Sequence, residues 1–401
     1  MQAIILAAGE GSRMRPLTAK TPKVMLPVAG KPLLEQIILR ARSAGADRFV
    51  IVVGYQADTV RSHLDDGSRL GVEIEYAVQE QQLGTGHALM AAESLAADRF
   101  MVLNGDVLPD VESLKAMSWE DAAVSAIRVD DPTRYGVFLE ENGIFKSVVE
   151  KSPTPPSNLA NAGIYVIGHS IFDALHAAPL SERGEYELTD ALNLLAARET
   201  IRVKTLDSWL EIGRPWDILA ANEALLKEMK PSVVGIVEPG AVLKGSVSVG
   251  KDSLVMAGAY IEGPVIIGEN CKIGPNCYIR ASTCIGDEVR VGNAVEIKNS
   301  AIFSGTKIGH LSYVGDSLIG RNCNFGAGTI CSNLRHDKAN IRSFIKGKRV
   351  DSGRRKLGVI MGDNVMTGIH TTIYTGTVID SGYRGLPGAI LKGHLIPNRE
   401  P

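Results

Sequence analysis

The stretch that decides the fold of the C-terminal half runs from Val237 to Ile297 and reads VEPGAV LKGSVS VGKDSL VMAGAY IEGPVI IGENCK IGPNCY IRASTC IGDEVR VGNAVE I. Each group of six begins with Val, Leu or Ile, so eleven successive sixth residues are aliphatic. A small or β-branched residue, such as Ala241, stands two positions before most of them. Gly often follows the aliphatic residue, as at Gly250 and Gly268, where a sharp corner needs a residue without a Cβ atom.

A period of six fits neither an amphipathic helix, whose apolar face would drift, nor a flat half-buried strand, whose period is two. It is typical of a parallel β-helix, in which each group of six forms one face and three groups form one coil. The aliphatic side chains would fill the interior, and the outer faces would remain free to pair with copies of the chain. The pattern resembles the left-handed β-helix of the hexapeptide acyltransferase family.

The bulk composition excludes several classes of protein. The chain has 401 residues, enough for two or three domains, and its net charge of -2 gives no global attraction to nucleic acid or anionic membranes. No apolar run approaches the ~20 residues of a membrane span, and the N-terminus lacks the basic segment of a signal peptide. The five cysteines form no CxxC metal pattern, and Cys271 and Cys277 fall at small positions of the repeat, which favours packing. We therefore expect a cytoplasmic protein with no nucleic-acid or membrane partner.

The N-terminus begins with an apolar run over residues 2–7, which predicts a buried parallel strand. A glycine-containing stretch over residues 8–18 follows, and then Pro22 and Lys23. Glycines after a strand let backbone N–H groups approach phosphate oxygens, and Arg13 and Lys23 add positive charge. The stretch is neither a P-loop nor the longer dinucleotide fingerprint, so these residues alone also fit an ordinary strand and turn.

The full string LAAGEGSRM at residues 6–14, with Pro22-Lys23 and Gly30-Lys31-Pro32, resembles the signature of sugar-1-phosphate nucleotidylyltransferases. The resemblance extends over roughly residues 1–225 and implies a Rossmann-like α/β domain, consistent with the helix-like segment 33–44 and the strand-like segment 48–53. It implies catalytic roles for Arg13 and Lys23 and hydrogen bonds from Gln79 and Gln82 to the nucleobase. The nucleotide-binding residues that it implies are Leu6, Ala8, Gly9, Gly11, Gln79, Gln82, Gly84 and Thr85.

A metal site is predicted at Asp106, which follows the buried strand over residues 100–103. Ligands of open α/β sheets bind at the carboxyl ends of the strands, and Mg²⁺ usually takes only one or two protein carboxylates. The resemblance implies Asp106 as one metal ligand and Glu211 as the second, although the family usually has Asp at the latter position. The sugar 1-phosphate would be bound by Gly136, Glu150, Lys151 and Asn161, also by resemblance.

The far end of the repeats carries a different motif, His310-x-x-Tyr313-x-Gly-Asp316, followed by Asn324-x-Gly-Ala-Gly. It resembles the acetyltransferase half of the bacterial bifunctional enzyme that makes UDP-N-acetylglucosamine, and still more an archaeal sugar-1-phosphate nucleotidylyltransferase/amino-sugar acetyltransferase. An amine that attacks acetyl-CoA must lose a proton, and His310 is the natural general base. The acceptor and acetyl-CoA would be held by Arg280, Lys298, Tyr313, Asn324, Ala327 and Asn333. The segment Asn333–His336 departs from the bacterial Asn-Tyr-Asp-Gly, and the repeat weakens after Gly376.

Together these patterns predict a nucleotidylyltransferase domain over residues 1–230 and a β-helix acetyltransferase domain over residues 231–401. Mg²⁺ would be the cofactor, and a nucleoside triphosphate, a sugar 1-phosphate and acetyl-CoA would be the small-molecule partners of a homotrimer. UTP and dTTP both remain open, as do glucose and the amino sugars. One alternative keeps nucleotidyl transfer and makes the β-helix an oligomerisation or regulatory module. Another is a non-enzymatic translation-factor subunit of the same architecture.

Overall fold

The computed structural model describes residues 1–397. Contacts within the chain divide it into two compact units. The first comprises Met1–Glu10, Pro22–Met25 and Pro32–Glu211, and the second comprises Gly11–Thr21, Leu26–Lys31 and the chain from Ile212 onward. The contact boundary after Glu211 therefore precedes the domain boundary predicted at residue 230, and two short N-terminal segments join the second unit.

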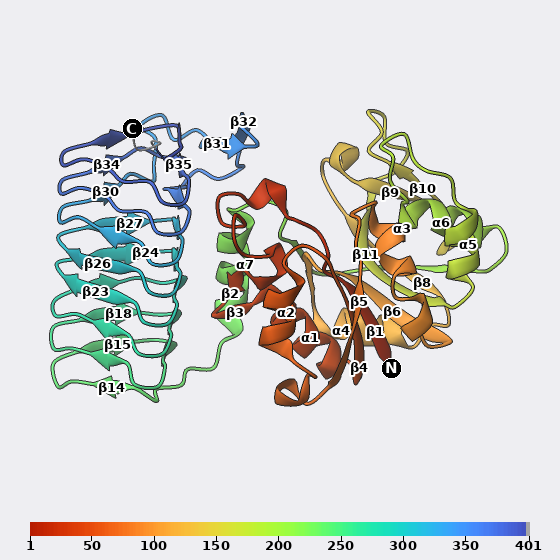
Figure 1. Ribbon diagram of the computed structural model, residues 1–401, viewed down its shortest axis with the longest axis horizontal. Helices are drawn as coiled ribbons and strands as arrows, with labels where there is room; N and C mark the ends of the chain where they lie inside the picture. Colours follow the sequence, from red (N-terminus) through yellow and green to blue (C-terminus); the bar gives the residue numbers. More distant parts are fainter. Residues whose placement is uncertain (398–401) are drawn as a thin grey trace. The chain divides into compact units, whose positions relative to one another are not determined.

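The first unit is built on a nine-stranded mixed sheet (Figure 1). Its order is β5 (Glu73–Val78), β4 (Arg48–Val53), β1 (Gln2–Leu6), β6 (Arg99–Asn104), β11 (Leu159–Gly168), β8 (Ala123–Arg128), β12 (Arg202–Thr205), β10 (Ile144–Glu150) and β9 (Gly136–Glu141). The first four strands of this order are parallel, and β11 runs antiparallel to β6. Almost every residue of β1, β4 and β6 is buried, as expected of parallel strands covered on both faces.

The chain order of the four parallel strands creates a switch point between β1 and β6. After β1 the chain continues to β4 and β5 on one side, and then returns to β6 on the other side. Leu6, at the end of β1, pairs with Asn104 at the end of β6. Open α/β sheets bind ligands in the crevice at such a point, so the residues that follow Leu6 and Asn104 face the expected ligand position.

Helices and short strands complete the first unit. They are α1 (Leu33–Ser43), α2 (Ala57–Leu64), α3 (Thr85–Met90), α4 (Val111–Ser118), α5 (Ile171–Ala177), α6 (Leu188–Ala196), β7 (Val107–Pro109) and β13 (Trp209–Glu211). Helix α1 buries Leu33, Leu34, Ile37 and Ile38, whose spacing forms one apolar face. The helix predicted over residues 33–44 and the strand over 48–53 are confirmed.

The second unit is dominated by three parallel sheets that wind as a β-helix (Figure 1). One contains β14 (Ile236–Val237), β17 (Leu254–Val255), β20 (Lys272–Ile273), β23 (Arg290–Asn293), β26 (Lys307–His310) and β29 (Asn324–Phe325). The next contains β15 (Val242–Lys244), β18 (Tyr260–Glu262), β21 (Tyr278–Ile279), β24 (Glu296–Lys298), β27 (Tyr313–Gly315), β30 (Ile330–Cys331), β34 (Thr372–Ile373) and β36 (Ile390–Leu391). The third contains β16 (Val247–Val249), β19 (Val265–Ile267), β22 (Thr283–Ile285), β25 (Ala301–Ile302), β28 (Leu318–Ile319), β33 (Ile360–Met361), β35 (Val378–Ile379) and β37 (His394–Leu395).

The register of these strands confirms that three groups of six form one coil. Val237 pairs with Val255, and Val255 pairs with Ile273, a step of 18 residues (255 − 237). The repeated aliphatic residues from Val249 to Ile297 are buried in one continuous core, with Val237 and Leu243 partly buried against it, and Cys271 and Cys277 pack within it. After Ile297 the step shortens, since Val291 pairs with Ile308, 17 residues on (308 − 291).

The glycines at the corners are required by close packing against the neighbouring coil. A Cβ atom on Gly250 would collide with the backbone of Gly268, one coil further on. The left-handed backbone conformation lies two residues later, at Asp252 and Asn270, with φ of 58° and 54°. The glycine is therefore needed for close approach of two coils, and the corner itself is turned by the following polar residue.

The second unit also contains elements outside the three sheets. Helix α7 (Asp217–Leu225) is followed directly by a 3₁₀ turn over Leu226–Glu228. Strands β2 (Pro27–Val28) and β3 (Lys31–Pro32) form a small ribbon across the unit boundary in the chain, and β31 (Arg342–Ile345) and β32 (Lys348–Asp351) form a hairpin. Within residues 1–397, no helix combines the length and the apolar character needed to cross a membrane.

Candidate functional site

The first site lies at the carboxyl ends of β1 and β6. The Gly105 N–H donates to the Leu6 carbonyl at 3.0 Å, which brings the turn after β6 against the end of β1. A Cβ atom at position 105 would lie 2.6 Å from that carbonyl oxygen, so only glycine fits. This close approach places the turn that contains Asp106 against Leu6 and Ala7, at the switch point of the sheet.

Lys23 and Asp106 form an ion pair in this site. The Lys23 Nζ donates to Asp106 Oδ2 at 2.7 Å, although the two residues are 83 positions apart in the chain. Only 11% of the Lys23 side chain and 28% of the Asp106 side chain are exposed. The structure therefore brings together two of the predicted residues, with one cation and one carboxylate ready for a phosphate and a divalent ion.

Glu211 reaches the same region through a two-stranded ribbon. Strand β13 pairs antiparallel with β7, and Glu211 lies opposite Val107, the neighbour of Asp106. Over residues 1–397 no group of three or more His, Cys, Asp and Glu side chains could hold a metal by itself. Two carboxylates fit Mg²⁺, which keeps several waters and binds substrate phosphates for its remaining ligands.

The predicted base-binding loop is internally hydrogen-bonded. Gln82 Nε2 donates to the Ala8 carbonyl at 2.9 Å, which ties the loop to the first glycine motif. The Gln79 side chain is buried, and its Nε2 lies 3.0 Å from the Gly84 carbonyl and 3.1 Å from His87 Nδ1. Gln79 therefore shapes the loop with its amide nitrogen, and its predicted contact with the base remains a prediction.

Gly84 and Thr85 pack against the segment that leads into α6. Gly84 has φ of 100°, and a Cβ atom there would lie 2.6 Å from the Tyr186 carbonyl oxygen. Thr85 Oγ1 accepts from the Leu188 N–H at 3.1 Å, at the first residue of α6. Both residues thus have a structural reason for their identity in addition to the predicted nucleotide contact.

The predicted sugar residues gather around Tyr165, which the sequence interpretation did not assign. Asn161 Nδ2 donates to the Tyr165 hydroxyl at 2.8 Å. Gly136 pairs with Glu150 across β9 and β10, and a Cβ atom on Gly136 would lie 2.6 Å from Glu150 Oε1. Burial raises the pKa of Tyr165, and the nearby charges of Glu150 and Asp106 raise it further. The Tyr165 hydroxyl is therefore hydrogen-bonded to Asn161, and the charges of Glu150 and Asp106 both act on it.

Three predicted residues of the first site have a different setting. Lys151, at the end of β10, adopts a left-handed conformation with φ of 41°, and its N–H donates to the Tyr135 carbonyl at 3.1 Å. Gly11 and Arg13 belong to the second compact unit, where Gly11 has φ of 68° and precedes the 3₁₀ turn Ser12–Met14. Arg13 is exposed, and its catalytic role remains a prediction.

The second site is organised by Asp316, a buried carboxylate of the quoted motif that received no role from the sequence. Its Oδ2 accepts from Lys298 Nζ at 3.2 Å and from Asn333 Nδ2 at 2.5 Å, and its Oδ1 accepts from Asn299 Nδ2 at 2.8 Å. Asn333 also donates to the Tyr313 hydroxyl at 3.1 Å. Burial raises the pKa of Tyr313, and the Asp316 charge raises it further. Lys298, Tyr313 and Asn333 are therefore brought together.

His310 and Asn324 lie on a different sheet of the β-helix from Tyr313. Strands β26 and β29 are neighbours, with Lys307 opposite Asn324. The Gly328 N–H donates to the His310 carbonyl at 3.3 Å, which places His310 beside the segment Ala327–Gly328 of the next coil. Within one chain the residues predicted for acetyl transfer thus form two groups, one with His310 and one with Asp316.

Arg280 extends the group that contains Asp316. Its Nη1 donates to Glu296 Oε1 at 2.9 Å, and its guanidinium lies 5.6 Å from the centre of the Tyr278 ring. The positive charge of Arg280 also acts on the Tyr313 hydroxyl and lowers its pKa, against the larger effect of burial.

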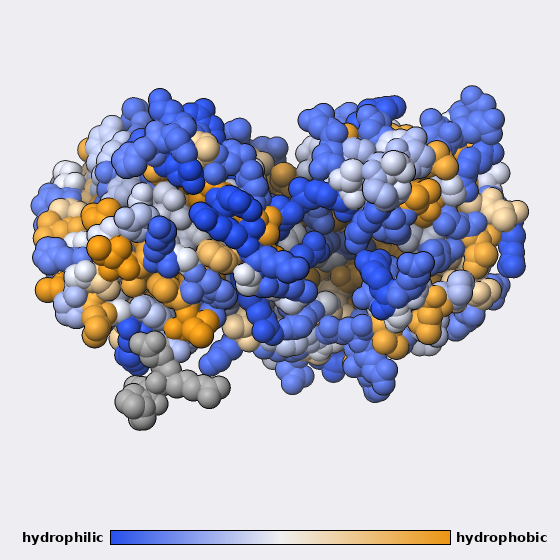
Figure 2. All heavy atoms as spheres, turned by 90° about the horizontal axis from the view of Figure 1, so that it is seen from above, coloured by the Kyte–Doolittle hydropathy of each residue, from blue (hydrophilic) through white to orange (hydrophobic). Residues whose placement is uncertain are grey.

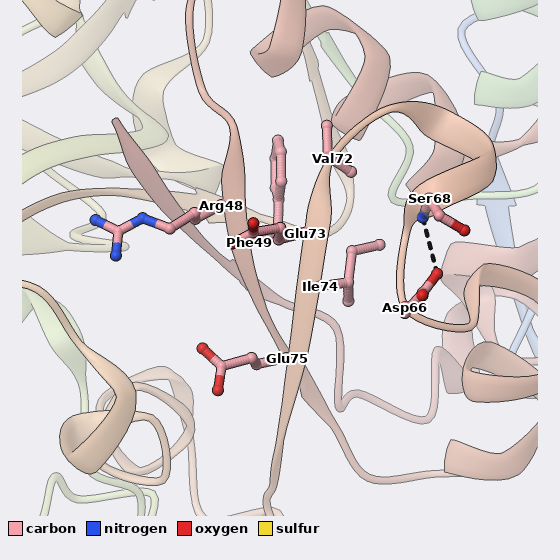
Figure 3. Close-up of a pocket in the computed structure, with 8 residues that line it drawn as sticks. All are labelled: Arg48, Phe49, Asp66, Ser68, Val72, Glu73, Ile74 and Glu75. Atoms are coloured by element: carbon pink, nitrogen blue, oxygen red, sulfur yellow. Dashed lines mark hydrogen bonds between the residues drawn. The ribbon is translucent and has the colours of Figure 1, made fainter.

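A surface hollow of about 300 Å³ lies elsewhere in the first unit (Figure 3). It is lined by Arg48, Phe49, Asp66, Ser68, Val72, Glu73, Ile74 and Glu75, and Figure 3 shows the hydrogen bond from the Ser68 N–H to Asp66 Oδ1. Arg48 and Glu73 are the first residues of β4 and β5, so the hollow lies at the amino ends of these strands. Ligands of parallel sheets bind at the opposite end, and the hollow contains none of the predicted residues.

Comparisons with known proteins agree with this geometry. The nucleotidyl transferase family matches residues 2–228, and the family described as GMPPB C-terminal domain matches residues 261–384. A solved structure of a UDP-glucose pyrophosphorylase complexed with UDP-glucose is 27% identical and has a TM-score of 0.51, with 57% of this chain and 99% of that chain covered.

Two relatives match almost the whole chain. The bifunctional protein GlmU of Methanocaldococcus jannaschii is 42% identical over 386 residues, which cover 95% of this chain and 92% of that protein. The bifunctional sugar-1-phosphate nucleotidylyltransferase/acetyltransferase of Sulfurisphaera tokodaii is 40% identical over 399 residues, which cover 98% and 97%. The N-terminal half therefore belongs to the nucleotidyl transferase family, and the whole chain belongs to the archaeal family of bifunctional GlmU-type proteins.

Proposed function

We propose that this chain is a bifunctional enzyme of nucleotide-sugar synthesis in the cytoplasm. Residues 1–230 would transfer a nucleotidyl group from UTP or dTTP to glucose 1-phosphate or N-acetylglucosamine 1-phosphate. Residues 231–401, wound as a left-handed β-helix, would acetylate glucosamine 1-phosphate or galactosamine 1-phosphate. Four residues of this second range, 398–401, lie outside the described residues. The names of the relatives and the arrangement of both sites support the proposal.

Nucleotidyl transfer needs no protein nucleophile. A phosphate oxygen of the sugar 1-phosphate attacks the α-phosphorus in line, a new P–O bond forms, and the bond to the β-phosphate breaks with release of pyrophosphate. Lys23 neutralises charge on the phosphates, and the backbone around Ala8 and Gly9 approaches them closely. Asp106 and Glu211 would hold Mg²⁺, which supplies charge neutralisation and orients the triphosphate. Glu150 and Asn161 orient the sugar.

The observation that carries this half of the proposal is the Lys23–Asp106 pair at the β1–β6 switch point. Its 2.7 Å ion pair joins the phosphate motif to the metal carboxylate in a partly buried setting. A solvent-exposed pair would be an ordinary surface feature, whereas two mostly covered charges at the ligand-binding end of a parallel sheet indicate a site.

Acetyl transfer would use His310 as the general base. The amine of the amino sugar attacks the thioester carbonyl carbon, His310 accepts the amine proton, and the C–S bond breaks to release the thiol of CoA. The group around Asp316 supports this role, because a buried carboxylate holds Lys298 and Asn333 in fixed positions for the anionic acceptor. Ala327 precedes Gly328, whose N–H donates to the His310 carbonyl, and with Asn324 on the neighbouring strand it would contact the acetyl group.

A homotrimer through the β-helix is part of the proposal. The sheet from β15 to β36 has an outward column of residues that begins Val242, Tyr260 and Tyr278 and ends with Ile330, Thr372 and Ile390. Of these, Val242 and Ile330 are each 43% exposed and Ile390 is 70% exposed. Figure 2 shows hydrophobic residues on the surface of the β-helix. A second copy would cover them and bring its own residues to the groups around His310 and Asp316.

The experiment that tests the proposal measures two products in parallel. Thiol release from acetyl-CoA is followed with glucosamine 1-phosphate and galactosamine 1-phosphate, and pyrophosphate release is followed with UTP or dTTP and a sugar 1-phosphate. We expect His310→Ala to abolish thiol release and leave pyrophosphate release unchanged. No thiol release by the wild type with either amino sugar would overturn the acetyltransferase half and leave the β-helix as an oligomerisation module. The exposed apolar column would then be its main functional feature.

A further inference from the structure

A basic insertion interrupts the coils next to the second site. The chain leaves the β-helix after β30 and returns at β33, and between them it forms the β31–β32 hairpin. Both ends of the insertion meet at Asn333. The Leu357 N–H donates to the Asn333 carbonyl at 3.1 Å, and Leu334 pairs with Lys356 in an antiparallel bridge. Because Asn333 also contacts Tyr313 and Asp316, the insertion is rooted in the site proposed for acetyl transfer.

The insertion has a strong excess of positive charge. Residues 334–357 contain nine Lys and Arg and two Asp, in a chain whose net charge is -2. Two of the cations are paired, Arg335 with Asp337 and Arg354 with Glu223. Seven exposed cations have no ion pair among the described residues: Lys338, Arg342, Lys346, Lys348, Arg349, Arg355 and Lys356. Such a concentration of unpaired like charges repels itself and favours a multiply charged anion as a ligand.

Four of these cations, Arg342, Lys346, Lys348 and Arg349, lie in the β31–β32 hairpin. Its two-residue turn, Lys346-Gly347, has positive φ at both positions, 48° and 74°, as a tight hairpin turn of matching twist requires. The buried Ser343 Oγ donates to the Gly376 carbonyl at 2.9 Å, which fastens β31 to the coil stack. Figure 1 shows β31 and β32 standing out from the side of the coils near their C-terminal end.

An aromatic pair lies beside the cations. The rings of Phe344 and His394 are 6.0 Å apart with an interplanar angle of 36°. Phe344 lies directly opposite Arg349 in the hairpin, so the two side chains point to the same face. Aromatic rings beside cationic groups suit a planar base attached to phosphates.

We propose that the β31–β32 hairpin binds the adenosine end of acetyl-CoA. Its unpaired cations would hold the diphosphate and the 3′-phosphate, and the Phe344–His394 pair would contact the adenine. The thioester would then extend from the hairpin to its root at Asn333, toward the acceptor. This inference rests on the proposed acetyltransferase activity and adds to it the residues that select a nucleotide-linked acetyl donor.

The test compares acetyl donors with and without the nucleotide. The triple variant Lys346→Gln, Lys348→Gln, Arg349→Gln removes three charges from the hairpin, and the control variant Lys251→Gln, Lys272→Gln, Arg290→Gln removes three exposed charges elsewhere on the β-helix. We expect the hairpin variant to raise the KM for acetyl-CoA at least tenfold, with kcat, the KM for S-acetylpantetheine and pyrophosphate release unchanged. The control variant should keep the wild-type KM for both donors. An unchanged KM for acetyl-CoA, or an equal rise for S-acetylpantetheine, would overturn the assignment.

Calorimetric titration with CoA separates this inference from the proposed activity. If the wild type transfers no acetyl group but binds CoA, and the hairpin variant binds it at least tenfold more weakly, the hairpin site stands and the acetyltransferase proposal fails. If the wild type acetylates and both proteins bind CoA equally, the hairpin assignment fails alone. If the wild type neither acetylates nor binds CoA, both fail.

Discussion

Replacing Asp316 by Asn removes one buried negative charge and leaves the size of the side chain unchanged. Asp316 is 2% exposed, and its two oxygens accept from three donors, Lys298, Asn299 and Asn333. Asn has one carbonyl oxygen and one NH₂ group at this place. In either orientation the NH₂ group faces at least one of the donors, so at least one hydrogen bond is lost and Lys298 loses its counter-charge.

The expected cost follows from burial of both partners. The Lys298 side chain is 20% exposed and lies 3.2 Å from Asp316, so solvent replaces little of the lost interaction. A hydrogen bond to a charged group contributes about 1.5–3 kcal/mol, and removal of one partner of a buried ion pair costs about 3–5 kcal/mol. We expect Asp316→Asn to lower the free energy of unfolding by about 3 kcal/mol. For a domain of this size, that corresponds to a fall in Tm of about 6–12 °C.

Differential scanning calorimetry of the full chain measures this loss, with Glu262→Gln as the matched control. Glu262 accepts from Lys244 at 3.1 Å and from the Tyr278 hydroxyl at 2.9 Å, but the Lys244 side chain is 63% exposed and Glu262 is 36% exposed. Exposed ion pairs contribute little to stability, so the control should unfold close to the wild type. Equal Tm values for the two variants would refute the argument that burial makes Asp316 the centre of the second site.

Three further changes test the first site and the core. Asp106→Asn should lower the rate of pyrophosphate release roughly a hundredfold or more, because it removes a carboxylate that would hold Mg²⁺ and the counter-charge of Lys23, and leave thiol release unchanged. Gly105→Ala should cost about 1–3 kcal/mol in urea unfolding, because its Cβ would lie 2.6 Å from the Leu6 oxygen; a stable Ala variant would contradict that contact. Burial raises the pKa of Cys331 to about 12, whereas a cysteine in an unfolded chain has a pKa of about 8.5. The stability that the neutral Cys331 thiol contributes is therefore complete below about pH 8.5. It falls by about 1.4 kcal/mol per pH unit as pH rises toward 12, because only the unfolded chain then loses the proton. Stability of the wild type should therefore fall more steeply in this range than that of Cys331→Ala, as thermal unfolding between pH 8 and pH 11 would show.

The β-helix could be predicted because its repeat constrains nearly every coil in the same way. Each aliphatic residue of the period faces the same core, nine of the eleven fully buried and Val237 and Leu243 partly, so eleven residues carry one signal. The step shortens to 17 residues in two successive coils, from Val291 to Ile308 and from Ile308 to Phe325. The sequence analysis did not predict the hairpin, because its two strands of four residues each are too short to separate from an irregular segment.

The sequence predicts which residues form the first site, but only part of how these residues contact one another. Strand ends identify residues such as Asp106, because the carboxyl ends of parallel strands meet at one edge. Sequence order does not reveal that Lys23 pairs with Asp106, or that Gln79 uses its amide nitrogen within its own loop. Asp316 was present in a quoted motif and Tyr165 was not, and the importance of both arises from burial beside other charged groups, which the sequence does not display.

The nucleotidylyltransferase signature is one continuous motif in the sequence, and the fold divides it between two compact units. Gly9 and Lys23 belong to the first unit, whereas the segment Gly11–Thr21 belongs to the second. Within that second unit, Arg321 Nη1 donates to Thr21 Oγ1 at 2.5 Å, and the Ala29 N–H donates to Asn222 Oδ1 at 2.8 Å. A hexapeptide period reveals where the coils begin, but it contains no information about which distant residues pack against the outside of the coils. A residue of the β-helix therefore contacts the signature segment Gly11–Thr21, which lies in the sequence between Gly9 and Lys23 of the first site.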